Sequence, residues 1–245
     1  MRRAVSGALA VLSMCTAVAP LAFGADAPKA VPQVTGDRFP TSQGDLVVHA
    51  MKHATIAFGW NGRTVYVDPT EGPQMRYEEK PAPDLIVLTG PGKDHVDVAE
   101  LQKLVQKTTR IVAPVAVQQE LPPDLQSKTA VLARGESTAA FGIGVDSAAG
   151  RGAHNGYVLT FGGTRVYVSG DLEDPAEIGG LENIAVAFVD FNEPPATTAE
   201  STAAAVRALN PKAVYPYNYK GGDPVEFRGL VGWESKIEVR IRTWY

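Results

Sequence analysis

The chain has 245 residues, of which 44% are hydrophobic and 20% are charged. This length and composition are typical of one globular domain or two small ones, and they exclude a disordered or fibrous protein. The net charge of −4 argues against nucleic acid as a partner, and the single cysteine excludes both an intrachain disulfide framework and a cysteine-based zinc site.

Residues 1–24 are predicted to be a cleaved signal peptide. Arg2 and Arg3 precede an uncharged apolar stretch, and Ala22-Phe23-Gly24 offers the small residues that a signal peptidase reads. An uncleaved anchor is the alternative, and lipid attachment at Cys15 is a second one that the bulky preceding Met14 disfavours. We therefore expect a periplasmic or secreted protein with no integral membrane segment after cleavage.

The mature chain is expected to begin with a flexible leader over residues 25–43, which are rich in proline and poor in large apolar side chains. A single domain over 44–245 follows. Its first half predicts strands over 45–51, 54–60, 64–67, 85–88 and 110–113. The dipeptide Asn61-Gly62 predicts a hairpin, and Asp97 is positioned to cap a helix whose apolar face includes Leu101 and Leu104.

The middle of the chain, residues 114–147, predicts a short helix near Val117 and two or three edge strands. A second hairpin is predicted over 157–169, with Gly162-Gly163 at its turn. A buried strand is expected over 184–189. The sequence Thr197-Thr198-Ala199-Glu200 predicts a capping box that opens a helix ending at Leu209, and closing strands are expected over 213–215 and 237–241.

Both halves repeat one arrangement. A hairpin ends at an acid, Asp68 or Asp171, and a buried strand then leads to a helix. This repetition predicts two sheets packed face to face with helices outside, a four-layer αββα sandwich of the α/β class. Functional side chains of such a fold are expected on loops at one edge of the sheets.

Several short motifs resemble those of the metallo-β-lactamase superfamily, in its branch of small metal-dependent hydrolases and lactonases. They are His53-Ala54-Thr55, Val67-Asp68-Pro69, the stretch 83–89, the stretch 155–159, Val168-Ser169-Gly170-Asp171 and Tyr215-Pro216-Tyr217. The resemblance spans nearly all of residues 45–245. It implies the αββα fold and a site in which two metal ions activate water to hydrolyse an ester, lactone, amide or phosphodiester.

The metal ligands implied by the resemblance are largely absent. The family pattern is a Thr-His-x-His-x-Asp-His loop, a histidine on a later strand, a Gly-Asp turn and a late histidine. Here the four positions that have lost an imidazole are Gly90, Gly92, Ala149 and Asn218, whereas Asp94, His95 and Asp171 remain. The two zinc ions of the family are therefore not expected. A weak residual set of Asp94, His95, Asp171 and Asn218 could hold one hard divalent ion such as Mg²⁺, Ca²⁺ or Mn²⁺, or none.

Each remaining candidate also has a structural interpretation. Asp94 and His95 could form a hydrogen-bonded pair that holds the loop, Asp171 could be a turn acid, and Asn218 could pack in a pocket wall. Among the other histidines, His53 is expected to make a structural hydrogen bond. His154 could turn inward and replace a lost ligand.

The loop Gly90-Pro91-Gly92-Lys93 supports a further hypothesis. Backbone N–H groups, a following helix and the Lys93 ammonium could together bind an anion, although the loop could equally have collapsed into space left by missing metals.

The leading functional prediction is an exported member of the hydrolase family whose two-metal site is largely lost. Such a protein would be inactive or much reduced in activity, and it could bind a small anionic metabolite. The alternative is a hydrolase of an ester, lactone or phosphodiester that uses one metal, with Asp94 and Asp171 as its catalytic carboxylates. A purely structural or interaction role has no positive signal in the sequence, and no protein partner is predicted.

Overall fold

The structure is a computed structural model that describes residues 33–72, 75–149, 152–172, 174–191 and 197–244. The predicted signal peptide and the first part of the predicted leader, residues 25–32, lie outside these residues. The leader was predicted to continue to residue 43, and that boundary is wrong. Strand β1 (Asp37–Thr41) already pairs with β2 (Gly44–Lys52) in an antiparallel hairpin.

The first sheet has seven strands in sequence order. After β1 and β2 it contains β3 (Thr55–Trp60), β4 (Arg63–Val67), β5 (Leu85–Val87), β6 (Arg110–Ala113) and β7 (Thr129–Val131). Strands β1 to β4 are antiparallel, and β4 to β7 are parallel.

The second sheet repeats this plan with a further seven strands. They are β8 (Ser137–Ala140), β9 (Ile143–Ala149), β10 (Gly156–Phe161), β11 (Thr164–Val168), β12 (Ile184–Val189), β13 (Ala213–Pro216) and β14 (Glu238–Val239). Strands β8 to β11 are antiparallel and β11 to β14 are parallel. The carboxyl ends of the parallel strands are thus available to carry a site in each half.

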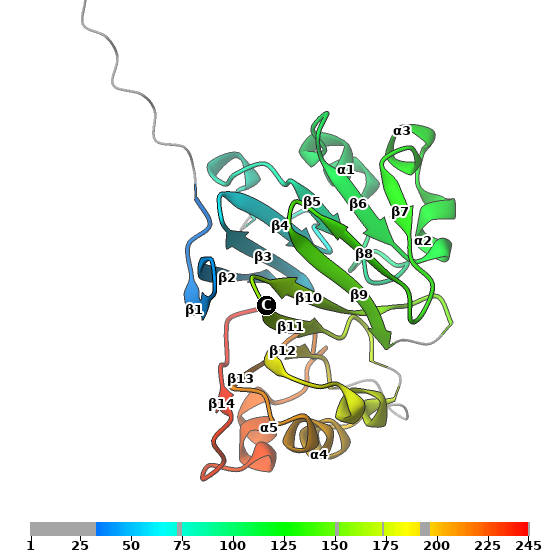
Figure 1. The fold of residues 1–245 in the computed structure, drawn as a ribbon. Coiled ribbons are helices and arrows are strands. Elements are labelled where there is room, and N and C mark those ends of the chain that lie inside the picture. The colour runs from blue at the N-terminus through cyan, green and yellow to red at the C-terminus, as the bar shows by residue number, and fades with distance from the viewer. Residues whose placement is uncertain (1–32, 73–74, 150–151, 173, 192–196, 245) are drawn as a thin grey trace, which may run out of the picture. The chain divides into compact units, whose positions relative to one another are not determined.

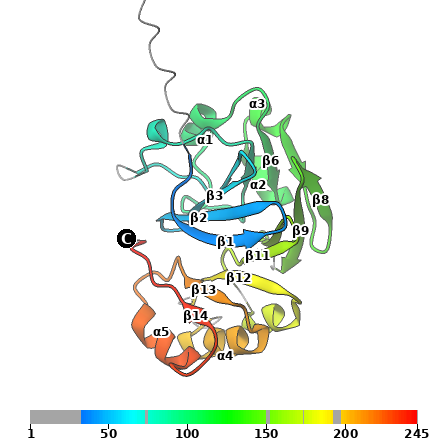
Figure 2. The ribbon, with the colours of Figure 1, turned by 60° about the vertical axis from the view of Figure 1, so that its left-hand side comes forward.

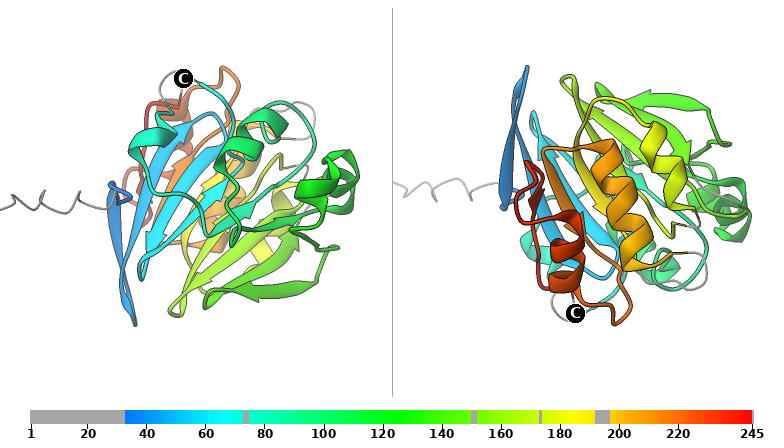
Figure 3. Two further views of the ribbon diagram at one scale, coloured as in Figure 1. Left: turned by 90° about the horizontal axis from the view of Figure 1, so that it is seen from above. Right: turned by 90° about the horizontal axis from the view of Figure 1, so that it is seen from below.

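Helices cover the outer face of each sheet, as the predicted four-layer sandwich requires (Figures 1 and 2). The first sheet carries α1 (Val98–Leu104), α2 (Val115–Glu120) and α3 (Pro123–Gln126), and the second carries η2 (Pro175–Gly180), α4 (Ala199–Leu209) and α5 (Pro224–Val231). The short η1 (Tyr77–Glu79) lies between β4 and β5. Views from the two opposite sides show one set of helices in front of each sheet (Figure 3).

The main core lies between the two sheets. The ring of Phe58 contacts those of Phe161 and Phe188 there, with centroid distances of 5.5 and 5.9 Å. Strand β5 is apolar at every position because Leu85 and Val87 face this core while Ile86 faces the helices. The uninterrupted apolar run in the sequence therefore reflects burial on both faces.

Turn and cap chemistry account for most element boundaries. Asn61-Gly62 and Gly162-Gly163 both have positive φ angles, as the two-residue turns of right-twisted hairpins require. Asp97 caps α1 as predicted, accepting from the Glu100 backbone N–H. The capping box of α4 is real but uses Thr198 and Ser201 instead of Thr197 and Glu200.

Helices α3 and α5 were not predicted, and the last strand is shorter than residues 237–241. No helix within the described ranges is long and apolar enough to cross a membrane.

Candidate functional site

A buried polar cluster lies where parallel strands of both sheets end. Asp68 follows β4 directly, and Thr89 and His95 lie in the loop between β5 and α1. Asp171 follows β11, and Asn218 follows β13. The symmetric plan of the two sheets therefore brings polar side chains from distant parts of the chain to one place.

Asp68 is the hub of the cluster and has no exposed surface. Its Oδ1 accepts from the Thr89 backbone N–H at 2.8 Å, and its Oδ2 accepts from the Thr89 hydroxyl at 2.6 Å. The same Oδ2 lies 2.8 Å from Nδ1 of His95. Asp68 has a left-handed backbone (φ 43°), which aspartate tolerates better than most residues. Its carboxylate fixes both the loop and the orientation of the His95 ring.

His95 is held between two carboxylates. Its Nδ1 faces Asp68, and its Nε2 lies 3.1 Å from Oδ1 of Asp171, although the ring is only 2% exposed. Burial lowers the pKa of His95, but the charges and hydrogen bonds of Asp68 and Asp171 outweigh burial and raise that pKa to about 10. Each ring nitrogen of His95 thus has a carboxylate partner.

Asp171 is brought to His95 by a close approach of the two loops. A Cβ on the preceding Gly170 would lie 2.8 Å from Cβ of Thr89, and Gly170 has a φ of 63°, so only glycine fits. Burial raises the pKa of Asp171, but His95, Lys220 and His154 together lower it to about 2. The carboxylate is 24% exposed at the side chain and forms the open side of the cluster.

Asn218 and Lys220 complete the surroundings of Asp171. The Asn218 amide donates to Oδ1 of Asp171 at 3.0 Å, and the Lys220 ammonium lies 3.8 Å from the same oxygen. Asn218 is buried, and its position in a pocket wall stays a prediction. Oδ1 of Asp171 thus faces three nitrogen groups at once.

Asp190, which directly follows β12, is a second buried acid near the cluster. Its Oδ1 accepts from the Leu172 N–H at 2.9 Å, and its Oδ2 has no partner among the described residues. Burial and the charge of Asp171 raise the pKa of Asp190 well above its usual range. Sequence patterns gave no signal for this residue or for Lys220, because a single charged residue after a strand is common.

The remaining predicted site residues of the first loop are spread out. Asp94 and Lys93 are exposed, as is Gly92, whereas Gly90 is buried. Asp94 is near enough to His53 to influence its pKa, which burial lowers overall. The backbone N–H of His53 donates to the Trp244 carbonyl at 2.8 Å. Asp94 therefore lies outside the buried cluster that contains His95.

The helix that was expected to help Lys93 bind an anion offers little. Helix α1 begins only at Val98, and the Asp97 carboxylate already accepts the free N–H of Glu100 at its amino end. The anion hypothesis for Gly90, Gly92 and Lys93 thus stays a prediction and gains no support from this helix.

His154 lies beside the cluster. Its ring centroid is 6.1 Å from that of His95, with an interplanar angle of 81°. Its neighbour Asn155 is fixed by the loop of Thr89, because the Asn155 N–H donates to the Thr89 carbonyl at 2.7 Å. The fourth histidine, His49, lies on β2, where its Nδ1 is 2.6 Å from the Thr35 carbonyl oxygen.

These residues do not fit a two-metal centre. Within the described part of the chain, no three histidine or acidic side chains converge closely enough to hold a metal ion as they stand. Of the predicted residual set, His95, Asp171 and Asn218 are brought together, and Asp94 is not. The cluster is held by hydrogen bonds and ion pairs among its own side chains.

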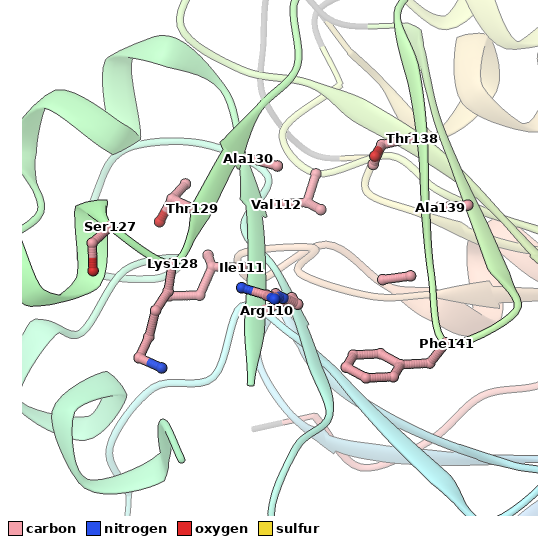
Figure 4. A pocket seen from close by; sticks show the side chains of 11 residues that line it. Arg110, Ile111, Val112, Ser127, Lys128, Thr129, Ala130, Thr138, Ala139 and Phe141 are labelled. Carbon is pink, nitrogen blue, oxygen red and sulfur yellow. The ribbon is translucent and has the colours of Figure 1, made fainter. Parts of the chain in front are cut away.

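A separate cavity of about 450 Å³ opens between β6, β7 and the β8 hairpin (Figure 4). Arg110, Lys128 and Phe141 line it. None of its lining residues belongs to the buried cluster, so it is a different feature of the surface.

Comparison with known proteins places the fold. Residues 48–218 match the β-lactamase superfamily domain. A proposed metal-dependent hydrolase from Parabacteroides distasonis is 30% identical, with a TM-score of 0.77, over 86% of this chain and all of that one. No curated protein matches the chain.

More distant structures share the fold. The metallo hydrolase Igni18 from Ignicoccus hospitalis is 19% identical, with a TM-score of 0.63, over 80% of this chain and 94% of its own. The metallo-β-lactamase fold protein YhfI from Bacillus subtilis is 15% identical, with a TM-score of 0.65, over 86% and 94%. Together with the matched domain, these likenesses show that the chain belongs to the metallo-β-lactamase fold superfamily.

Proposed function

We propose that this protein no longer carries out two-metal hydrolysis and that its hydrolytic activity is absent or strongly reduced. The proposal rests on the metal-ligand side chains that the chain retains. A pair of metal ions needs several imidazoles and carboxylates directed at two nearby points. Three such groups remain of the implied set, and one of them, Asp94, is exposed away from the others.

One observation carries the proposal. The two nitrogens of His95 lie within hydrogen-bond distance of two carboxylates, so the ring acts as the link of a closed cluster. Hydrogen bonds to charged groups contribute about 1.5–3 kcal/mol each. The cluster thus supplies a structural reason to keep Asp68, His95 and Asp171 in a protein without a two-metal site.

A second candidate is a hydrolase that uses a single metal ion. It is favoured by the 3.1 Å separation of Nε2 of His95 and Oδ1 of Asp171, two groups that commonly share a metal ligand sphere. A single ion can still activate water when one coordination position stays open.

A hydrolysis assay tests the proposal. Purified protein is incubated with an excess of Zn²⁺ or Mn²⁺ and with an activated ester, a lactone and an activated phosphodiester. We expect no turnover above that of Asp171→Ala, which removes the partly exposed carboxylate of the cluster. Turnover on the order of 1 s⁻¹ or more, lost in Asp171→Ala and with two ions bound, would overturn the proposal.

The same assay separates the second candidate. Turnover that is lost in Asp171→Ala but needs only one ion per chain supports the single-metal hydrolase. Turnover that persists in Asp171→Ala comes from a contaminant or from another part of the protein. Metal content measured on the same samples distinguishes these cases.

A further inference from the structure

The cavity shown in Figure 4 lies between the free edges of the two sheets. Strand β7 is the last strand of the first sheet, and β8 is an edge strand of the second. Both strands line the cavity with short side chains, which are Thr129 and Ala130 of β7 and Thr138 and Ala139 of β8. Its volume of about 450 Å³ lies in the range of small-molecule sites. The cavity is therefore large enough for a small organic ligand.

Positive charge gathers at one end of this cavity. Arg110 is the first residue of β6, and Lys128 directly precedes β7. Arg110 is exposed, and its side chain forms no ion pair or hydrogen bond with the described part of the chain. The Lys128 ammonium donates to the carbonyl oxygens of Gln106 and Lys107 at 3.0 and 2.8 Å, which holds it in place without neutralising its charge. None of the lining residues that the structure describes is an acid, so the cavity favours an anion.

The hairpin of β8 and β9 contributes an aromatic ring from an unusual position. Phe141 is the first residue of the two-residue turn and has a φ of 54°. Such turns favour the pair found at Asn61-Gly62, and a bulky side chain at the first position is strained. Arg63, which is paired with Asp84 at 2.7 Å, has its guanidinium carbon 4.9 Å from the centroid of the Phe141 ring. Strain of this kind is concentrated at ligand-binding positions, and an aromatic ring suits a flat apolar group.

The cavity and the buried polar cluster lie at opposite ends of the same strands. Strands β4 to β7 run parallel. Arg63, Arg110 and Lys128 lie at or just before the first residues of three of these strands, whereas Asp68 follows the last residue of β4. The loop of Lys93 follows β5 and so belongs to the end that carries the cluster. A ligand in the cavity would therefore occupy a site of its own.

We propose that this cavity binds a small organic anion, a molecule with a carboxylate or phosphate group on an apolar body. The charged group would contact Arg110, because a guanidinium forms paired hydrogen bonds with both kinds of anion. The apolar body would pack between the short side chains of β7 and β8 and against the Phe141 ring. The inference goes beyond the proposed function, since the site lies at the other end of the strands and needs no hydrolysis.

An NMR titration with 2-naphthoate tests the inference, because this probe joins a carboxylate to a flat apolar body. We expect one saturable site per chain with a Kd on the order of 0.1–1 mM at low salt. Backbone amide signals of residues 110–112, 129–130 and 138–141 should shift, and those of Thr89 and Gly170 should not. The neutral probe 2-naphthalenemethanol should bind about 5-fold more weakly or worse.

Two variants separate the charge from the ring. Arg110→Gln should weaken 2-naphthoate binding about 5-fold or more, whereas Arg38→Gln, which removes an exposed arginine from β1, should leave it unchanged. Phe141→Asn installs the residue that the turn favours, so the melting temperature should stay the same or rise. The same variant should weaken binding about 5-fold, which a purely structural role of the ring would not predict.

Three results would overturn the inference. They are the absence of saturable shifts up to about 10 mM 2-naphthoate, equal affinity for the neutral probe, and an unchanged Kd in Arg110→Gln. Shifts confined to Thr89 and Gly170 also overturn it, because binding then occurs at the buried cluster. None of these results changes the outcome of the hydrolysis assay, so the proposed function is tested separately.

Discussion

Replacing Asp68 by asparagine tests whether the buried cluster holds the fold. Asparagine keeps the shape of the side chain and tolerates the left-handed backbone at this position. It can still accept from the Thr89 N–H, but the oxygen that faces the Thr89 hydroxyl and Nδ1 of His95 is replaced by an amide NH₂ group, which donates and carries no charge. Two hydrogen bonds to a charged group contribute about 1.5–3 kcal/mol each.

Part of this loss is recovered, because the new amide can donate to the Thr89 hydroxyl. We therefore expect Asp68→Asn to lower the free energy of unfolding by about 3 kcal/mol, measured by urea denaturation in a chelator. Asp45→Asn is the control, since its ion pair with Arg38 is exposed and contributes less than about 1 kcal/mol. An Asp68→Asn loss as small as that of the control would refute the account of the cluster.

Three further outcomes follow from the same geometry. The pKa of His95 is about 10 in the folded protein, compared with an ordinary value of 6.5. Its ion pairs therefore stabilise the folded state fully below pH 6.5, and this stabilisation is lost as the pH rises toward 10. The urea concentration at the midpoint of denaturation, measured in a chelator, should decrease over this pH range. This decline should be absent in His95→Gln. Gly90→Ala should destabilise by about 1–3 kcal/mol through contact with His154, and His154→Ala should relieve that loss in the double variant. The raised pKa of Asp190 means that its carboxyl stays protonated in the folded protein at a pH where the unfolded chain ionises it, which opposes folding. Asp190→Asn should therefore raise the melting temperature at neutral pH and leave it unchanged near about pH 3.

Much of the fold follows from local patterns in the sequence. The apolar run 85–88 and the two-residue turns at Asn61-Gly62 and Gly162-Gly163 predict strands that the structure contains. Strand β1 was missed because Pro40 lies within it. Proline is tolerated there because β1 is an edge strand.

The site was predictable only in part. The acids Asp68 and Asp171 follow strands, which the sequence shows, and the loss of imidazoles at 90 and 92 is plain. The contact between Gly90 and His154 was not predictable, because it depends on how the loop before β10 meets the loop after β5. The exposed position of Asp94 also required the structure, since its spacing alone suggested a ligand beside His95.

The most direct test of the central claim is the number of metal ions per chain. Purified protein would be saturated with Zn²⁺, dialysed and analysed by mass spectrometry, with Asp94→Ala as a control that should change nothing because Asp94 is exposed. The account predicts fewer than two ions per chain. Two ions per chain, with one lost in Asp94→Ala, would show that a two-metal centre persists and would contradict the account.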